Sequence, residues 1–112
     1  MKENTEISEL LYRLGITAKY MGFQQVSYAV RLVLIQPERL QLVTKWLYPD
    51  VAKHCGTNWR AVERNIRAVI SVAWDLRPEV LDQIAGTHLE HKPCASQFLT
   101  MIAAYFRLGK TA

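Results

Sequence analysis

The sequence predicts an all-α protein, a compact bundle of about six to seven helices that contains a helix-turn-helix. Three observations predict this class. Apolar residues recur at the spacing of a buried helix face along almost the whole chain. Glycine and proline stand at the ends of these periodic segments, where helices stop and start. No segment alternates apolar and polar residues for long enough to favour a strand.

The first three predicted helices lie before Tyr48. The first ends at Gly15, and its apolar side is formed by Ile7, Leu10, Leu11 and Leu14. The second covers about 23–36 and is so densely apolar that we expect it at the centre of the core, with Pro37 ending it. The third covers about 38–47, and three of its residues are expected to face inward: Leu40, Val43 and Leu47.

The next two helices are predicted on either side of Gly56, which breaks the chain. A short helix over about 49–55 begins with a proline, a residue suited to the first turn. A longer helix follows over about 58–74. Its expected N-cap is Thr57 or Asn58, because a short polar side chain there can accept a hydrogen bond from the first turn.

The last two helices are predicted around a loop at 87–95. A short helix over about 78–84 begins with a proline and ends at Gly86. Ser96 is the expected cap of the final helix, which stops at Gly109. Three residues of this helix are expected to face the core: Leu99, Ile102 and Phe106.

Length and composition predict a single domain over 1–112, because 112 residues, half of them hydrophobic, suffice for one core. A formal net charge of +4 is compatible with a polyanionic partner but identifies none. The most apolar stretch, 26–35, contains Arg31 and is far shorter than the roughly 20 residues that span a bilayer. With two distant cysteines and no secretory leader, we expect a cytoplasmic protein without a membrane partner.

The predicted helix over 58–74 has two clearly different faces. On a helical wheel, one face gathers the apolar residues Val62, Ile66, Val69, Ile70 and Ala73. The opposite face gathers the polar residues Arg60, Glu63, Arg64, Arg67 and Ser71. Trp59 falls near the apolar side, so we expect it to pack at the start of the helix, and we expect Trp74 to lie in the core.

The helix-turn-helix over about 49–74 predicts a DNA-reading surface. Arg60, Glu63 and Arg64 lie near the start of the second helix, where side chains meet base edges, so we expect them to read bases. A guanidinium can donate to guanine O6 and N7, and a carboxylate can accept from cytosine N4. The residues expected at the DNA backbone are Arg67, Lys53, His54, Asn58 and Thr57.

Four segments of the chain resemble one family: "LYPDVAKHCGT", "VERNIRAVISVAW", "ISELLYRLGITAKYMGF" and "KPCASQFLTMIAAYFRL". They are similar to the C-terminal DNA-binding effector domain of the master response regulator that initiates sporulation in endospore-forming Firmicutes. The resemblance implies an all-helical domain of about six helices that binds a short G/C-containing promoter element. It also implies binding as paired or tandem copies, contact with the RNA polymerase sigma factor, and both activation and repression.

Carried over onto "VERNIR", the resemblance implies that Glu63 and Arg64 read bases and that Arg67 contacts the backbone. This chain departs from the family's pattern in "NWRA" before the motif and at Ala68, so we expect a different sequence preference or affinity. "DLRPEVLDQIAG", which resembles the polymerase-contacting region, is divergent. No residue here supplies the receiver domain found in family members.

Two other interpretations of these residues remain open. Glu63 and Arg67 can form an ordinary i, i+4 pair on a solvated face. The charged face can also belong to a helical protein-interaction module with an acidic partner, which would bind without regard to base sequence.

A metal site and an enzyme are not expected. His88, His91 and Cys94 carry side chains that zinc favours, but Pro93 and the lack of a fourth ligand argue against a site. No nucleophile with a base, carboxylate pair or phosphate-binding glycine loop is present as a local signature. We therefore predict no catalysis and no cofactor.

Overall fold

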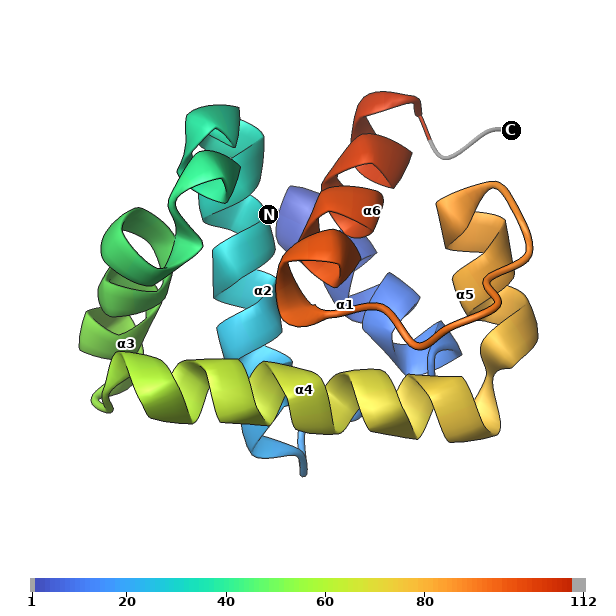
Figure 1. Ribbon diagram of the computed structural model, residues 1–112, viewed down its shortest axis with the longest axis horizontal. Helices are drawn as coiled ribbons and strands as arrows, with labels where there is room; N and C mark the ends of the chain where they lie inside the picture. The colour runs from blue at the N-terminus through green and yellow to red at the C-terminus, as the bar shows by residue number, and fades with distance from the viewer. Residues whose placement is uncertain (1, 110–112) are drawn as a thin grey trace.

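The structure, a computed structural model, describes residues 2–109 and shows an all-α fold without strands in that range (Figure 1). Its elements are α1 (Lys2–Arg13), α2 (Met21–Ile35), η1 (Pro37–Gln41), η2 (Val43–Leu47), α3 (Tyr48–Cys55), α4 (Trp59–Leu76), α5 (Pro78–Ala85) and α6 (Ala95–Arg107). The predicted class is confirmed. Met1 and residues 110–112 of the expected domain lie outside the described residues.

The core lies on one side of α4. In Figure 1, α4 spans the width of the molecule, with α3 at one end, α5 at the other, and α2 and α6 between them. The side chains shared by these helices are fully or almost fully buried, among them Val26, Val30 and Val33 of α2, Val62, Ile66 and Ile70 of α4, and Phe98, Leu99 and Ile102 of α6. The central position predicted for the second helix is confirmed.

The closest approach of α2 to α4 is made at Gly22. A Cβ added there would lie 2.6 Å from the backbone oxygen of Asn65 and 2.7 Å from Cγ1 of Val69. One helical turn along α2, the buried Gln25 accepts a hydrogen bond from Asn65 Nδ2 at 3.1 Å. The absence of a side chain at Gly22 therefore lets α4 lie directly against α2.

The prediction of an α-helix over 38–47 is wrong. The chain instead forms a 3-10 helix, η1, and a π-helical turn, η2, separated by Leu42 at φ −141° and ψ 64°. Arg39 holds this geometry, because it donates to the Trp46 carbonyl at 2.8 Å and pairs with Asp50 at 2.7 Å. Of the residues expected to face inward, Leu47 is fully buried, whereas Leu40 and Val43 are half-buried.

The predicted cap of the last helix is also wrong. Cys94, not Ser96, is the N-cap of α6. Gln97 Oε1 accepts a hydrogen bond from the Cys94 backbone N–H at 3.1 Å, so the chain closes its first turn two residues earlier than predicted. Gly109, the predicted stop, follows α6 with φ 76°.

Candidate nucleic-acid interface

A short turn joins α3 to α4. Gly56 adopts φ 71°, a conformation that favours glycine, and the Thr57 backbone N–H donates to the Ala52 carbonyl at 2.9 Å. Asn58, one of the two expected caps, accepts a hydrogen bond from the Ala61 backbone N–H through Oδ1 at 2.9 Å. Ala52 is 4% exposed, and its small side chain lets the two helices pack closely at the turn. This is a helix-turn-helix connection, as predicted.

The two faces of α4 lie as the wheel predicted. Val62 and Ile66 are completely buried, while Arg60, Arg64 and Arg67 are exposed and Glu63 is half-buried. The expected apolar positions further along the helix, Val69, Ile70 and Ala73, are buried as well. The exposed arginines therefore form a row of positive charge on the side of α4 away from the core.

Glu63 and Arg67 form an ion pair with their oxygen and nitrogen 3.6 Å apart. The Arg67 side chain is 66% exposed and that of Glu63 34%. Such an i, i+4 pair in water contributes only a few tenths of a kcal/mol. The solvated pair considered in the sequence is thus present, but it is too weak to prevent either side chain from contacting a ligand.

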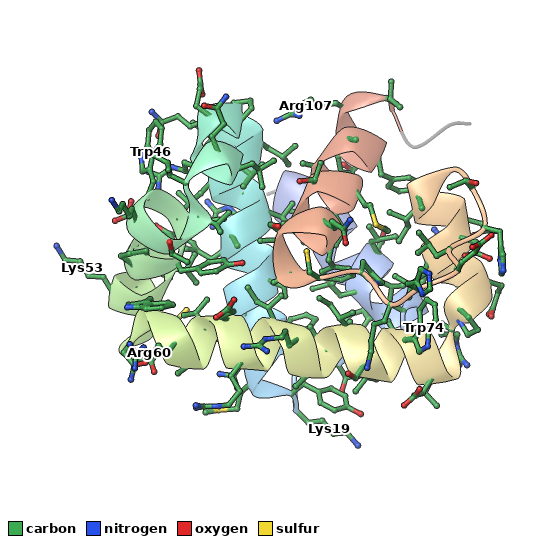
Figure 2. The ribbon with its side chains drawn as sticks, in the orientation of Figure 1. Lys19, Trp46, Lys53, Arg60, Trp74 and Arg107 are labelled. Carbon is green, nitrogen blue, oxygen red and sulfur yellow. The ribbon has the colours of Figure 1, made fainter. Side chains whose placement is uncertain are left out.

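The first turn of α4 places Arg60 beside Trp59. The Arg60 guanidinium carbon is 5.2 Å from the centre of the Trp59 ring. Trp59 is half-buried and packs against the core, as expected, and Trp74 at the other end is also half-buried. Figure 2 shows Arg60 pointing outward at the α3 end of α4. Arg64, by contrast, makes no ion pair or hydrogen bond through its side chain within residues 2–109.

The predicted backbone contacts on α3 and the turn are all exposed: Lys53, His54, Thr57 and Asn58. Lys53 projects away from α3 into solvent (Figure 2). His54 instead stacks on Tyr28 of α2, with ring centres 3.8 Å apart and planes within 3°. The two neighbouring basic residues of α3 therefore point in different directions, which the sequence did not indicate.

Two lysines from other parts of the chain also lie near the exposed face of α4. Lys92, in the loop before α6, donates from Nζ to Ser71 Oγ of α4 at 3.0 Å. Lys19 lies just before the contact of Gly22 with α4 and extends past α4 in Figure 2. Neither lysine could be assigned to this face from the sequence, because only the tertiary fold brings these separate segments of the chain beside α4.

Tyr48 of α3 is buried near Glu63, the one acidic residue named on this face. Burial raises its pKa to about 12, and the negative charges of Glu63 and Cys94 add to the effect. The exposed thiol of Cys94 has a lowered pKa, because the Ser96 hydroxyl and then the Gln97 backbone N–H stabilise the thiolate. Glu63 and the N-terminal end of α6, where Cys94 is the cap, thus each lie near Tyr48.

Tyr48→Phe is expected to remove part of the loss of stability that the protein undergoes at high pH. The folded state has a Tyr48 pKa of about 12 against the ordinary 10.0, so between these values the unfolded state releases a proton that the folded state keeps. The free energy of unfolding should therefore fall as pH rises from 10, by on the order of 2 kcal/mol at pH 12. Urea unfolding of Tyr48→Phe should lack this part of the fall. Tyr12→Phe, at an exposed ring, is the control, and equal alkaline losses in both variants and the parent protein would contradict the assignment.

The three residues weighed for zinc do not converge. His88 pairs with Asp82 at 2.9 Å, and Asp82 also accepts a hydrogen bond from the Leu89 backbone N–H at 3.0 Å. The bond from Leu89 and the contact with His88 lower the pKa of the Asp82 carboxyl. Cys94 caps α6. Within residues 2–109, no group of three His, Cys, Asp or Glu side chains is placed to hold a metal ion.

In the same range, no helix has the length and apolar character needed to cross a membrane.

Comparison with known protein families matches residues 7–106 to the family described as sporulation initiation factor Spo0A C terminal. The chain belongs to this family. The match includes α2 to α5 completely and nearly all of α6, so it covers both the core and the exposed face of α4. The Spo0A C-terminal domain is a DNA-binding helical domain of a sporulation response regulator. Its family is a family of regulator domains and not a class of enzymes. The family resemblance drawn from the sequence is confirmed.

Proposed function

We propose that this chain is a sequence-specific double-stranded DNA-binding transcription regulator of the sporulation response-regulator type. Residues 49–74 act as the helix-turn-helix, with α4 in the major groove. One observation carries the proposal. Arg64 and Glu63 lie side by side on the outward face of α4, whose opposite face is completely committed to the core.

The chemistry of this pair suits base recognition better than simple attraction to phosphate. A carboxylate among cations weakens binding to a polyanion, whereas it can accept a hydrogen bond from cytosine N4. The Arg64 side chain is exposed on α4, and its guanidinium can donate one hydrogen bond from each terminal nitrogen, to guanine O6 and N7. We assign base reading to Glu63, Arg64 and, at the end of the helix, Arg60.

The residues around this pair are placed for phosphates. We assign the DNA backbone to Arg67, Lys53, His54, Asn58 and Thr57, and add Lys19 and Lys92, which flank α4. Asn58 keeps its amide N–H groups for a phosphate, because the helix cap uses only its oxygen. These contacts would fix the depth of α4 in the groove without carrying sequence information.

We propose two further partners from the family resemblance. The segment from Asp75 to Gly86, which includes α5, is the candidate contact with the RNA polymerase sigma factor. Its exposed side chains include Arg77, Glu79 and Gln83. The second partner is another copy of this domain, either as a homodimer or as tandem copies on adjacent sites of the promoter.

Selection from a random duplex pool tests the proposed function. The domain is expected to enrich a short element that contains G/C pairs, at a salt concentration that removes duplexes bound only through phosphates. Recovery of a pool without any common element would contradict sequence-specific binding. That result, combined with tight binding of an acidic peptide to the same face, would favour the protein-interaction module instead.

Arg67→Ala is expected to weaken binding to all duplexes by a similar factor. A phosphate contact is independent of sequence, and its loss should lower the slope of log K against log salt by about 1. Fluorescence anisotropy at several salt concentrations, with the selected element and a scrambled duplex, measures both quantities. A loss confined to the selected element would show that Arg67 reads a base.

A further inference from the structure

A hollow of about 310 Å³ lies between α1, α2 and α3, away from the residues assigned to base reading. It is lined by Ser8, Phe23, Gln24, Ser27, Tyr28, Arg31 and His54. Arg31 is cationic and His54 becomes so on protonation, while no carboxylate is among these residues. The hollow therefore offers hydrogen-bond donors and positive charge, the combination that an anion requires.

Three of the lining side chains form an ordered stack. The Tyr28 ring lies face to face with the His54 ring, with centres 3.8 Å apart, and the Arg31 guanidinium carbon is 5.9 Å from the centre of the Tyr28 ring. Tyr28 thus holds an imidazole from α3 and a guanidinium from α2 at one rim. Because these donors are already positioned, little side-chain freedom is lost when an anion binds.

The hollow is continuous with the surface beside α4. A second hollow shares Phe23 and Gln24 with it and continues to Ala18, Tyr20 and Met21, next to the contact of α2 with α4. A third hollow shares Tyr28 and His54 with the first and reaches Lys53. Among the described residues that line these three hollows, the one carboxylate is that of Asp50, which is paired with Arg39 at 2.7 Å. A track with excess positive charge therefore leads from α4 around α3.

We propose that the hollow lined by Arg31, Tyr28 and His54 binds a phosphodiester group of the duplex that flanks the element read by α4. This inference rests on the proposed function. The Arg31 guanidinium can donate two hydrogen bonds to a phosphate, and a His54 N–H can donate a third. Since α2 leads away from α4, the flanking duplex must bend toward α2 to reach Arg31. Flanks with flexible pyrimidine–purine steps should therefore bind better than stiff A-tract flanks.

Paired duplexes test this site. One duplex is trimmed to the selected element, and the other extends it by about one helical turn, roughly 10 base pairs, at each end. The parent domain is expected to bind the longer duplex several-fold more tightly and with a salt slope steeper by about 0.9 per added phosphate. Arg31→Ala should lose this gain and keep the parent's affinity for the trimmed duplex, and Tyr28→Leu should lose the gain as well. Lys45→Ala removes an exposed charge of η2 outside the hollow and should keep the gain.

The outcomes separate this site from the reading face. Equal affinity of the parent domain for both duplexes, or an unchanged gain in Arg31→Ala, overturns the site while leaving sequence discrimination by α4 intact. Failure to discriminate the trimmed element from a scrambled one contradicts the proposed function itself. A titration with inorganic phosphate, followed through the NMR signals of His54 and the Arg31 Nε–H, identifies the source. Saturation below millimolar phosphate without DNA overturns the assignment to the DNA backbone, and weak or absent binding supports it.

Discussion

Arg64→Ala is expected to weaken binding to the selected DNA element by about 1 to 3 kcal/mol and to relax discrimination at one base pair. The magnitude follows from the loss of a bidentate contact to a guanine, because Arg64 has no ion pair with another residue of the described range 2–109 that must first be broken. Binding to a scrambled duplex should change much less. Anisotropy titrations on the element and on its single-pair variants measure the effect at each position.

Arg77→Ala is the matched control for this prediction. Arg77 is an exposed arginine beyond the end of α4, where its guanidinium donates to the Leu76 carbonyl at 2.9 Å. It carries the same charge but lies outside the reading face, so its loss should leave discrimination unchanged. Equal losses for Arg64→Ala on specific and scrambled duplexes would show that Arg64 contacts phosphate rather than a base.

Gly22→Ala is expected to destabilise the fold by roughly 1 to 3 kcal/mol. Two effects of opposite sign compete at this position. Alanine is favoured over glycine in a helix by about 0.5 to 1 kcal/mol. Against this, the new Cβ would lie 2.6 Å from a backbone oxygen of α4, and backbone cannot move aside as a flexible side chain can. The clash is therefore expected to win.

Urea unfolding of Gly22→Ala checks this prediction, with Gln24→Ala on the exposed side of the same helix as control. The control should change stability by less than about 0.5 kcal/mol. Because the clash pushes α4 away from α2, the Gly22→Ala variant should also discriminate less well between specific and scrambled duplexes. A variant as stable as the parent protein would show that α2 and α4 can separate without cost.

Much of the fold could be predicted because its helices are limited by residues with a local effect. Gly56 and Asn58 end one helix and start the next through their own backbone and side-chain hydrogen bonds. Pro37 ends α2 because it lacks a backbone N–H and cannot continue the hydrogen-bond ladder. Such signals depend on a few neighbouring residues, so the sequence contains them completely.

The region around η1 and η2 could not be predicted from spacing, because its geometry depends on a contact with another element. The pairing of Arg39 with Asp50 of α3, together with its bond to the Trp46 carbonyl, favours the irregular turns over a regular helix. Ser96 was chosen as a cap because its side chain suits that role, yet Gln97 reaches back to Cys94 and closes the first turn earlier. In both places, a longer side chain decides the backbone.

The candidate interface divides in the same way. The outward arc of α4 follows from helical periodicity alone, so Arg60, Glu63, Arg64 and Arg67 could be named from the sequence. Lys19 and Lys92 reach the same face from distant segments, and His54 turns toward Tyr28 because α2 packs against α3. These placements are properties of the tertiary structure, and no local pattern contains them.

Methylation protection of guanine N7 tests base reading by the exposed face of α4 most directly. Dimethyl sulfate attacks N7 in the major groove, the atom to which we assign an Arg64 hydrogen bond. With the selected element saturated by the parent domain, one guanine is predicted to be protected. The same guanine should react in the Arg64→Ala complex and stay protected in the Arg67→Ala complex. Full reactivity in the parent complex, or equal protection with Arg64→Ala, would contradict the account.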